Sequence, residues 1–205
     1  MTKFSTWFII FGVILQVLCY FITGDSWLSL VSGILGVISV VLCSDRKFSF
    51  YIFGFLQLFT YLILVFKNHL WGEVGENIFY LVTMVLGLFI WREDMEGGEV
   101  KSKSLSPWVR FILGVFSVVG IYGLWRYLET TNDPQPLLDS ITTVPAFIAQ
   151  ILMILCFREQ WIFWLIIDIG SIILWYNAGS WCMVLQYIFW TSNCVYGWIR
   201  WRKTL

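Results

Sequence analysis

The chain has 205 residues, of which 59% are hydrophobic, 20% aromatic and only 13% charged. A soluble domain of this length has too small an interior to bury that much apolar surface, so the composition predicts an all-α polytopic membrane protein. The formal net charge is zero, which argues against a nucleic acid as partner.

The chain contains apolar runs of about 17–25 residues, long enough to cross a bilayer as helices. Eight such spans are predicted: 6–23, 26–43, 48–66, 73–91, 108–128, 138–157, 160–176 and 180–199. The longest polar stretch, residues 92–107, is expected to be a solvated linker. The first run could also be a signal peptide, but it is long and has no small-x-small cleavage site, so a retained helix is expected.

Lysine and arginine are distributed unevenly between the two ends of the spans. An even number of spans places both termini on one side. Eleven of the 13 Lys and Arg residues fall on that side: Lys3, Arg46, Lys47, Arg92, Lys101, Lys103, Arg110, Arg158, Arg200, Arg202 and Lys203. The other side has only Lys67 and Arg126. Because positive residues gather in cytoplasmic loops, both termini are expected in the cytoplasm of a multi-pass protein of the cell inner (plasma) membrane.

Signals for metal binding and for catalysis are weak. The 5 cysteines lie within or at the ends of apolar runs without zinc-ligand spacing, and His69 is the single histidine, so no metal site is predicted. The sequence has no HExxH, GxSxG or nucleotide-binding GxxxxGK[ST] motif, and no Lys or Arg near the middle of a span. These features argue against an enzyme and against a bound cofactor.

An internal repeat relates residues 71–92 to residues 181–202 at an offset of 110. The matched positions are Trp71 with Trp181, Val74 with Val184, Ile78-Phe79 with Ile188-Phe189, Gly87 with Gly197, and Trp91-Arg92 with Trp201-Arg202. The predicted organisation is an extra N-terminal transmembrane helix (1–25), a first three-helix repeat (26–92), a cytoplasmic linker with a linking helix (93–128), and a second three-helix repeat with a basic C-terminus (129–205). Three helices and one linking helix make an even number of crossings, so the second repeat begins on the same side of the membrane as the first. The two repeats therefore have the same orientation in the membrane and are parallel. Internal repeats are common in transporters, with the substrate site between them near the bilayer midplane.

Polar side chains interrupt two repeat-related spans on matching faces. Gln186, Trp190 and Asn193 are spaced four and three residues apart, so they share one face of a helix. The matching face of the first repeat carries Glu76, Tyr80 and Thr83. Both faces are expected to line a shared internal cavity. The alternative is that the amides only join helices by hydrogen bonds.

Asp168 is the one carboxylate near the middle of a predicted span. Charge at that depth is expensive and usually marks function, although a protonated or paired structural carboxylate is the alternative. Gln57 lies in the corresponding helix of the first repeat, at the expected partner position. Most tryptophans lie near span ends, as in an interfacial belt, but Trp164 and Trp190 lie deeper and are candidates for stacking on a ligand ring.

The last span carries a longer pattern, formed by Trp181, Leu185, Gln186, Tyr187, Asn193, Tyr196, Gly197 and Trp198. With the three-one-three order of helices and the Trp-rich second repeat, this pattern resembles the PnuC family of vitamin transporters, which are similar in architecture to the SWEET sugar transporters. The resemblance covers nearly the whole chain except the first helix and the linker. It implies transport of nicotinamide riboside by facilitated diffusion, without ATP or an ion gradient, with phosphorylation by a cytoplasmic kinase trapping the product.

The candidate residues suit that ligand. Its pyridinium ring would stack on Trp190 or Tyr80, and its carboxamide would pair with amides. The amides that pair with the carboxamide would be Asn193 and Gln186. The ribose hydroxyls would contact Gln57, Thr83 or a carboxylate, and Asp168 or Glu76 would balance the charge of the ring. Another vitamin, such as thiamine, would use the same groups. The remaining alternatives are a proton-coupled carrier with Asp168 as the proton site, and a structural or assembly protein. The expected partners are a small-molecule substrate and the lipid bilayer, and assembly into a homo-oligomer stays open.

Overall fold

The computed structural model describes residues 2–24, 26–67, 71–131, 134–177 and 181–203. The described residues form eight helices and one short hairpin. These are α1 (Lys3–Thr23), α2 (Trp27–Ser44), α3 (Phe50–Lys67), α4 (Trp71–Glu93), β1 (Met95–Glu96), β2 (Glu99–Val100), α5 (Pro107–Leu128), α6 (Pro136–Ile154), α7 (Gln160–Asn177) and α8 (Trp181–Arg202). Each of the eight predicted spans coincides with one of these helices to within a few residues.

Length and hydropathy are sufficient for membrane crossing in five helices of the described chain: α1, α2, α4, α5 and α6. The described apolar parts of α3 and α7 are shorter. Large apolar side chains are exposed along the outward faces of α1 and α5, among them Trp7, Phe21, Phe116 and Val118. Surface of this kind requires a lipid environment, because water would not tolerate so large a continuous apolar area.

Local chemistry explains where several helices begin and end. The side chains of Ser26 and Ser106 accept hydrogen bonds from backbone N–H groups in the first turns of α2 and α5, as N-caps do. Gly24 ends α1 in the left-handed conformation, which glycine adopts without steric cost. The turns after α2 and α6 are tight, and in each a non-glycine residue has a positive φ, Arg46 at 57° and Cys156 at 66°.

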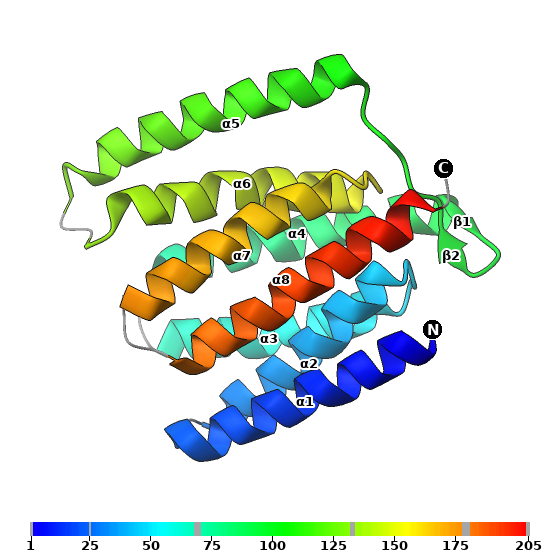
Figure 1. Cartoon of the computed structure of the whole chain (residues 1–205), viewed down its shortest axis with the longest axis horizontal. Helices are drawn as coiled ribbons and strands as arrows, with labels where there is room; N and C mark the ends of the chain where they lie inside the picture. Colours follow the sequence, from blue (N-terminus) through cyan, green and yellow to red (C-terminus); the bar gives the residue numbers. More distant parts are fainter. Residues whose placement is uncertain (1, 25, 68–70, 132–133, 178–180, 204–205) are drawn as a thin grey trace.

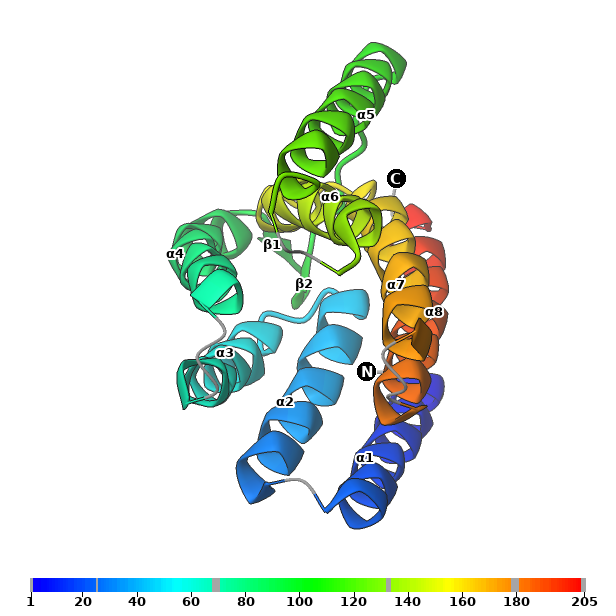
Figure 2. The same ribbon diagram turned by 90° about the vertical axis from the view of Figure 1, so that its left-hand side faces the viewer.

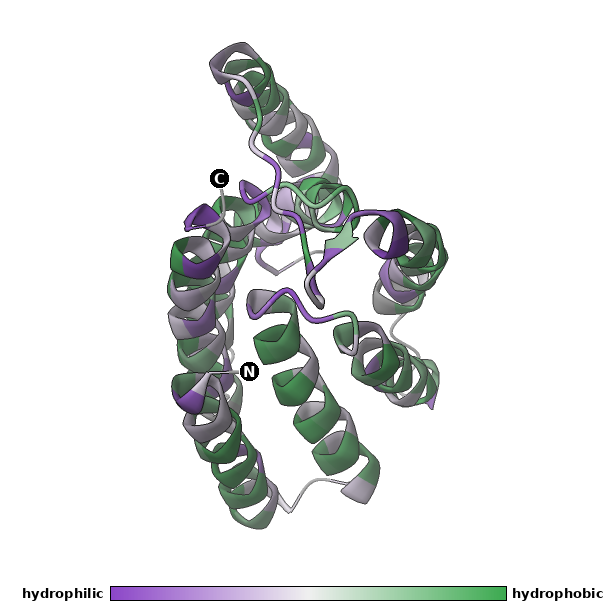
Figure 3. Ribbon diagram, turned by 90° about the vertical axis from the view of Figure 1, so that its right-hand side faces the viewer, coloured by the Kyte–Doolittle hydropathy of each residue, from purple (hydrophilic) through white to green (hydrophobic). Residues whose placement is uncertain are grey.

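The first and last described residues and the β1–β2 hairpin lie at the same end of the molecule, which we call the hairpin end (Figure 1). Hydrophilic segments of the ribbon gather there, whereas the helix bodies are mainly hydrophobic (Figure 3). Helix α2 lies between α3 and α1, and α5 lies on the outside against α6 (Figure 2). The contacts that bring distant parts of the chain together include those of α4 with α6 and of α8 with α2.

Two fully buried tryptophans hold these contacts together at the hairpin end. The indole N–H of Trp91, near the end of α4, donates to the carbonyl of Met153 in α6 at 3.0 Å. The indole N–H of Trp201, near the end of α8, donates to the carbonyl of Cys43 in α2 at 3.1 Å. The two ring centroids are 5.9 Å apart, so a single aromatic cluster joins four helices.

Two residues of the expected solvated linker, residues 92–107, are buried in the structure. Val100 is completely buried and Ser102 is nearly so. The backbone N–H of Val100 donates to the carbonyl of Arg46 at 3.0 Å, and that of Lys103 donates to the carbonyl of Cys156 at 2.7 Å. The polar composition is accurate, but the backbone of the linker is tied to two loops that lie far away in the sequence.

Candidate functional site

The predicted polar face of α4 lies at the contact of α4 with α6 and α7. The hydroxyl of Tyr80 donates to the carboxylate of Glu76 one turn earlier. The Tyr80 ring meets Trp164 of α7 edge-on, with centroids 6.5 Å apart. Thr83, which is 5% exposed, accepts a hydrogen bond of 3.0 Å from the amide of Gln150 in α6. Four of the predicted residues therefore form one group with mixed anionic and aromatic character.

Gln150 is a site candidate that the sequence analysis missed. Its side chain is buried, and its amide joins α6 to α4. The signal was present, because an amide inside the apolar span 138–157 is the same kind of anomaly as Gln186 in the last span.

The predicted polar face of α8 lies against α2. The side-chain oxygen of Asn193 accepts from the hydroxyl of Ser44 at 2.9 Å, and its N–H₂ group donates to the carbonyl of Val40 at 3.3 Å. Both polar groups of this buried amide are thus used between helices, as the helix-joining alternative requires. Trp190 differs, because its indole N–H is buried and has no hydrogen-bond acceptor among the described residues. Its ring packs edge-on against Tyr187, with centroids 5.1 Å apart.

Asp168 lies at the contact of α7 with α8. Its side chain is 3% exposed, and its carboxylate accepts a hydrogen bond from the thiol of Cys194 at 3.1 Å. Cys194 directly follows Asn193 in α8, and Trp164 of the α4 group lies one helical turn before Asp168 in α7. Gln57 and Gln186 are half-buried, and the Gln57 side chain packs close to Gly36 of α2.

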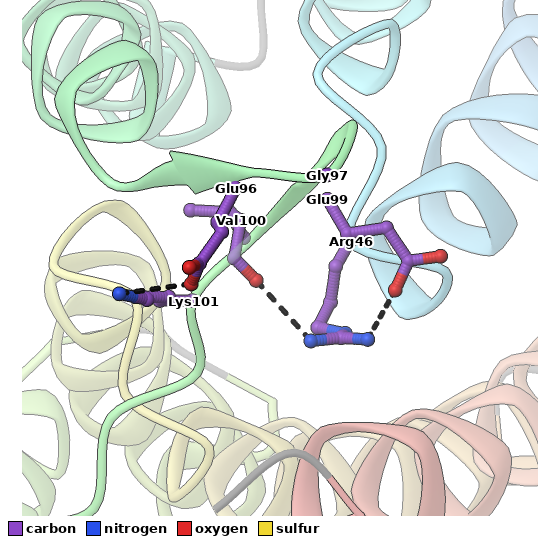
Figure 4. Close-up of a pocket in the computed structure, with 6 residues that line it drawn as sticks. All are labelled: Arg46, Glu96, Gly97, Glu99, Val100 and Lys101. Atoms are coloured by element: carbon purple, nitrogen blue, oxygen red, sulfur yellow. Dashed lines mark hydrogen bonds and ion pairs between the residues drawn. The ribbon is translucent and has the colours of Figure 1, made fainter.

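A cavity of about 220 Å³ lies at the hairpin end, and none of the nine predicted site residues lines it. Its walls carry mixed charge and come from Arg46, Glu96, Gly97, Glu99, Val100 and Lys101 (Figure 4). Within the residues that the structure describes, no group of three or more His, Cys, Asp and Glu side chains could hold a metal ion. His69 lies outside the described residues.

The apolar helices, the exposed apolar surface of α1 and α5, and the polar side chains enclosed between helices define a multi-pass helical membrane protein. Residues 26–203 match the family model described as nicotinamide mononucleotide transporter. The chain therefore belongs to that family, the PnuC family of transporters.

Individual relatives agree with this assignment. The chain is 35% identical over 204 residues to the nicotinamide riboside transporter PnuC of Haemophilus influenzae, a match that covers 96% of this chain and 88% of the relative. It is 32% identical over 217 residues to PnuC of Neisseria mucosa, covering 98% and 82%. The crystal structure of the vitamin B3 transporter PnuC superimposes with a TM-score of 0.82 at 30% identity, covering 100% of this chain and 92% of that chain. The relatives are named as transporters, not enzymes, as the sequence analysis predicts for this chain.

Proposed function

We propose that this protein carries nicotinamide riboside across the membrane by facilitated diffusion, with Glu76, Tyr80 and Trp164 at the centre of the substrate site. The observation that carries this proposal is the group formed by these three side chains, in which the Glu76 carboxylate is bonded to Tyr80 and the Tyr80 ring lies edge-on to Trp164. A pyridinium cation is attracted both to the faces of such rings and to the carboxylate. The names of the curated relatives support the same substrate.

The charge of the candidate residues favours the riboside over the mononucleotide named in the family description. The nine candidate residues include two carboxylates, Glu76 and Asp168, and no Lys, Arg or His. The phosphate of a mononucleotide would enter such a site without a cation to pair with, and a desolvated unpaired charge is costly. The riboside has no phosphate, and its ring is positive.

Paired contacts support the proposal of two parallel three-helix repeats, over residues 26–92 and 129–205, joined by the linker and linking helix of residues 93–128. Trp91 and Trp201, which are 110 positions apart, each donate to a carbonyl of the other proposed repeat. Thr83 and Asn193, also 110 apart, likewise each bond across to the other repeat. Equivalent contacts made in both directions are expected when the two repeats are related by an axis along the membrane normal, as in a SWEET-like layout. Residues 1–25 then form the extra N-terminal helix.

Facilitated diffusion is proposed because the predicted spans offer few groups that could couple transport to an ion. Asp168 is the one carboxylate deep within a predicted span. An inside-negative potential assists entry of a cationic riboside by about 2.3 kcal/mol per 100 mV without a coupling ion. Phosphorylation by a cytoplasmic kinase would then trap the product. The excess of Lys and Arg at the hairpin end supports an inner-membrane protein with both termini in the cytoplasm. The alternative remains a proton-coupled carrier of a related vitamin such as thiamine.

Ligand binding to the purified protein tests the proposed substrate. Calorimetry with nicotinamide riboside, nicotinamide mononucleotide, nicotinic acid riboside and thiamine should give the tightest binding for nicotinamide riboside. Equal or tighter binding of the mononucleotide would show that the site contains a cation the proposal lacks. Tightest binding of thiamine would favour the alternative carrier.

A further inference from the structure

Residues 95–105, between α4 and α5, contact the two halves of the molecule in the same way, and we call them the strap. The backbone N–H of Val100 donates to the carbonyl of Arg46, in the turn after α2, and that of Lys103 donates to the carbonyl of Cys156, in the turn after α6. Arg46 and Cys156 are 110 positions apart, and both have a positive φ. The strap therefore docks on equivalent positions of the two proposed repeats.

Ion pairs centred on Glu99 add to the docking of the strap beside Arg46. The Glu99 carboxylate pairs with the guanidinium of Arg46, with Lys47 at 3.2 Å and with Arg200 of α8 at 3.6 Å. The Arg46 side chain is only 6% exposed, and its guanidinium also donates to the carbonyl of Val100 at 3.3 Å (Figure 4). One carboxylate thus ties together the strap, the end of α2 and the end of α8.

The other end of the strap is fixed to the start of α7. The carboxylate of Glu159, which is 3% exposed, accepts from the backbone N–H of Leu105 at 3.2 Å and from the hydroxyl of Ser104 at 3.3 Å. It also pairs with Arg110 at 2.9 Å. The strap is therefore held to both halves at the hairpin end, where Trp91 and Trp201 close the contacts between them.

A transporter that releases its substrate at the hairpin end must separate these halves there. We propose that the strap is a latch that keeps the hairpin end closed, and that this end opens when Glu99 leaves Arg46 and Arg200. The inference rests on the proposed transport function, because only a transporter needs this end to open.

Neutralising Glu99 should favour the open state for an electrostatic reason. Burial lowers the pKa of Arg46, and the Glu99 carboxylate opposes that shift. With glutamine at position 99, the closed state retains a buried guanidinium near Lys47 and Arg200 without its main counter-charge, whereas opening exposes Arg46 to water. When one partner of a buried ion pair is removed, the conformation that keeps the remaining charge buried is strongly destabilised. Here that conformation is the closed state.

Cys156 is a native reporter of the latch, because it is completely buried in a turn that the strap covers. In the full-length protein reconstituted in liposomes, the rate at which N-ethylmaleimide alkylates Cys156 can be followed by mass spectrometry. Glu99→Gln should raise this rate about tenfold. The matched control is Glu96→Gln, since Glu96 pairs with Lys101 of the same strap and both side chains are about two-thirds exposed. This variant should label at the wild-type rate. Cys194, buried between helices, reports unfolding.

A second variant keeps the inference testable if Glu99→Gln unfolds and exposes Cys194. Arg200→Gln leaves the pair of Arg46 with Glu99 in place and removes only the pairs of Arg200 with Glu99 and with Asp45, so it should raise Cys156 labelling by a smaller factor. Wild-type labelling in both variants, or an equal increase in Glu96→Gln, would overturn the latch. Absence of riboside uptake by the wild type would instead refute the proposed function, while the labelling result would still decide whether the strap holds this end closed.

Discussion

Replacement of Glu76 by glutamine tests whether the carboxylate bonded to Tyr80 recognises a cationic ring. Glutamine keeps the shape and still accepts the hydroxyl of Tyr80, so the change removes charge alone. If the pyridinium stacks on Tyr80, its charge lies roughly 6 Å from the carboxylate. Coulomb attraction at an effective dielectric constant of about 20 is then about 3 kcal/mol, and partial access of water reduces the net loss to about 1–3 kcal/mol. Riboside affinity should fall by about 5-fold to 150-fold.

Calorimetry on the purified variant measures this loss, and neutral nicotinamide is the control ligand. Nicotinamide lacks the ring charge, so its affinity should be the same for the wild type and Glu76→Gln. Tyr80→Phe is the control variant, because it removes one hydrogen bond and retains the ring and the carboxylate, which should cost about 1 kcal/mol. An unchanged riboside affinity in Glu76→Gln, or an equal loss for nicotinamide, would refute the assignment of Glu76 as the counter-charge.

Further predictions concern the helix contacts and are checked by thermal unfolding together with riboside binding. Asn193→Leu should lower stability by about 1 kcal/mol, the value of two interhelical hydrogen bonds in a membrane, and Gln186→Leu should lower riboside affinity in a chain that still folds. A normal affinity in both variants would mean that these amides only join helices. Trp201→Phe should cost about 2 kcal/mol through one buried hydrogen bond and lost ring contact. Gly197→Ala should destabilise, since its Cβ would lie 2.5 Å from an indole of α7, whereas Gly123→Ala, where the space is open, should be neutral.

The helices were predictable from sequence because each one needs a long apolar run, and run length and hydropathy are local properties. The burial of Val100 and Ser102 within the linker was not predictable, because it is not a local property. It depends on contacts such as that of Val100 with the carbonyl of Arg46, which no local pattern encodes. Polar composition alone does not distinguish a segment that is bonded to the helix bundle from a linker that is free in solvent.

The candidate site was predictable only as a set of helix faces. Spacing correctly grouped Glu76, Tyr80 and Thr83 on one face of α4, but it could not identify the neighbour of that face, which includes Gln150. The same limit applies to Asn193, whose partner is Ser44 of α2. Whether a buried amide faces a cavity or another helix depends on the packing of the helices, which periodicity does not determine.

Uptake into liposomes that contain only the purified protein tests the central claim most directly. Nicotinamide riboside should enter down its gradient and stop at electrochemical equilibrium, and entrapped nicotinamide riboside kinase with ATP should extend uptake beyond that level. Neither an imposed proton gradient nor an imposed sodium gradient, at a membrane potential clamped to zero, should produce accumulation. Accumulation driven by either gradient would contradict facilitated diffusion and make Asp168, the buried carboxylate between α7 and α8, the first candidate for the coupling site.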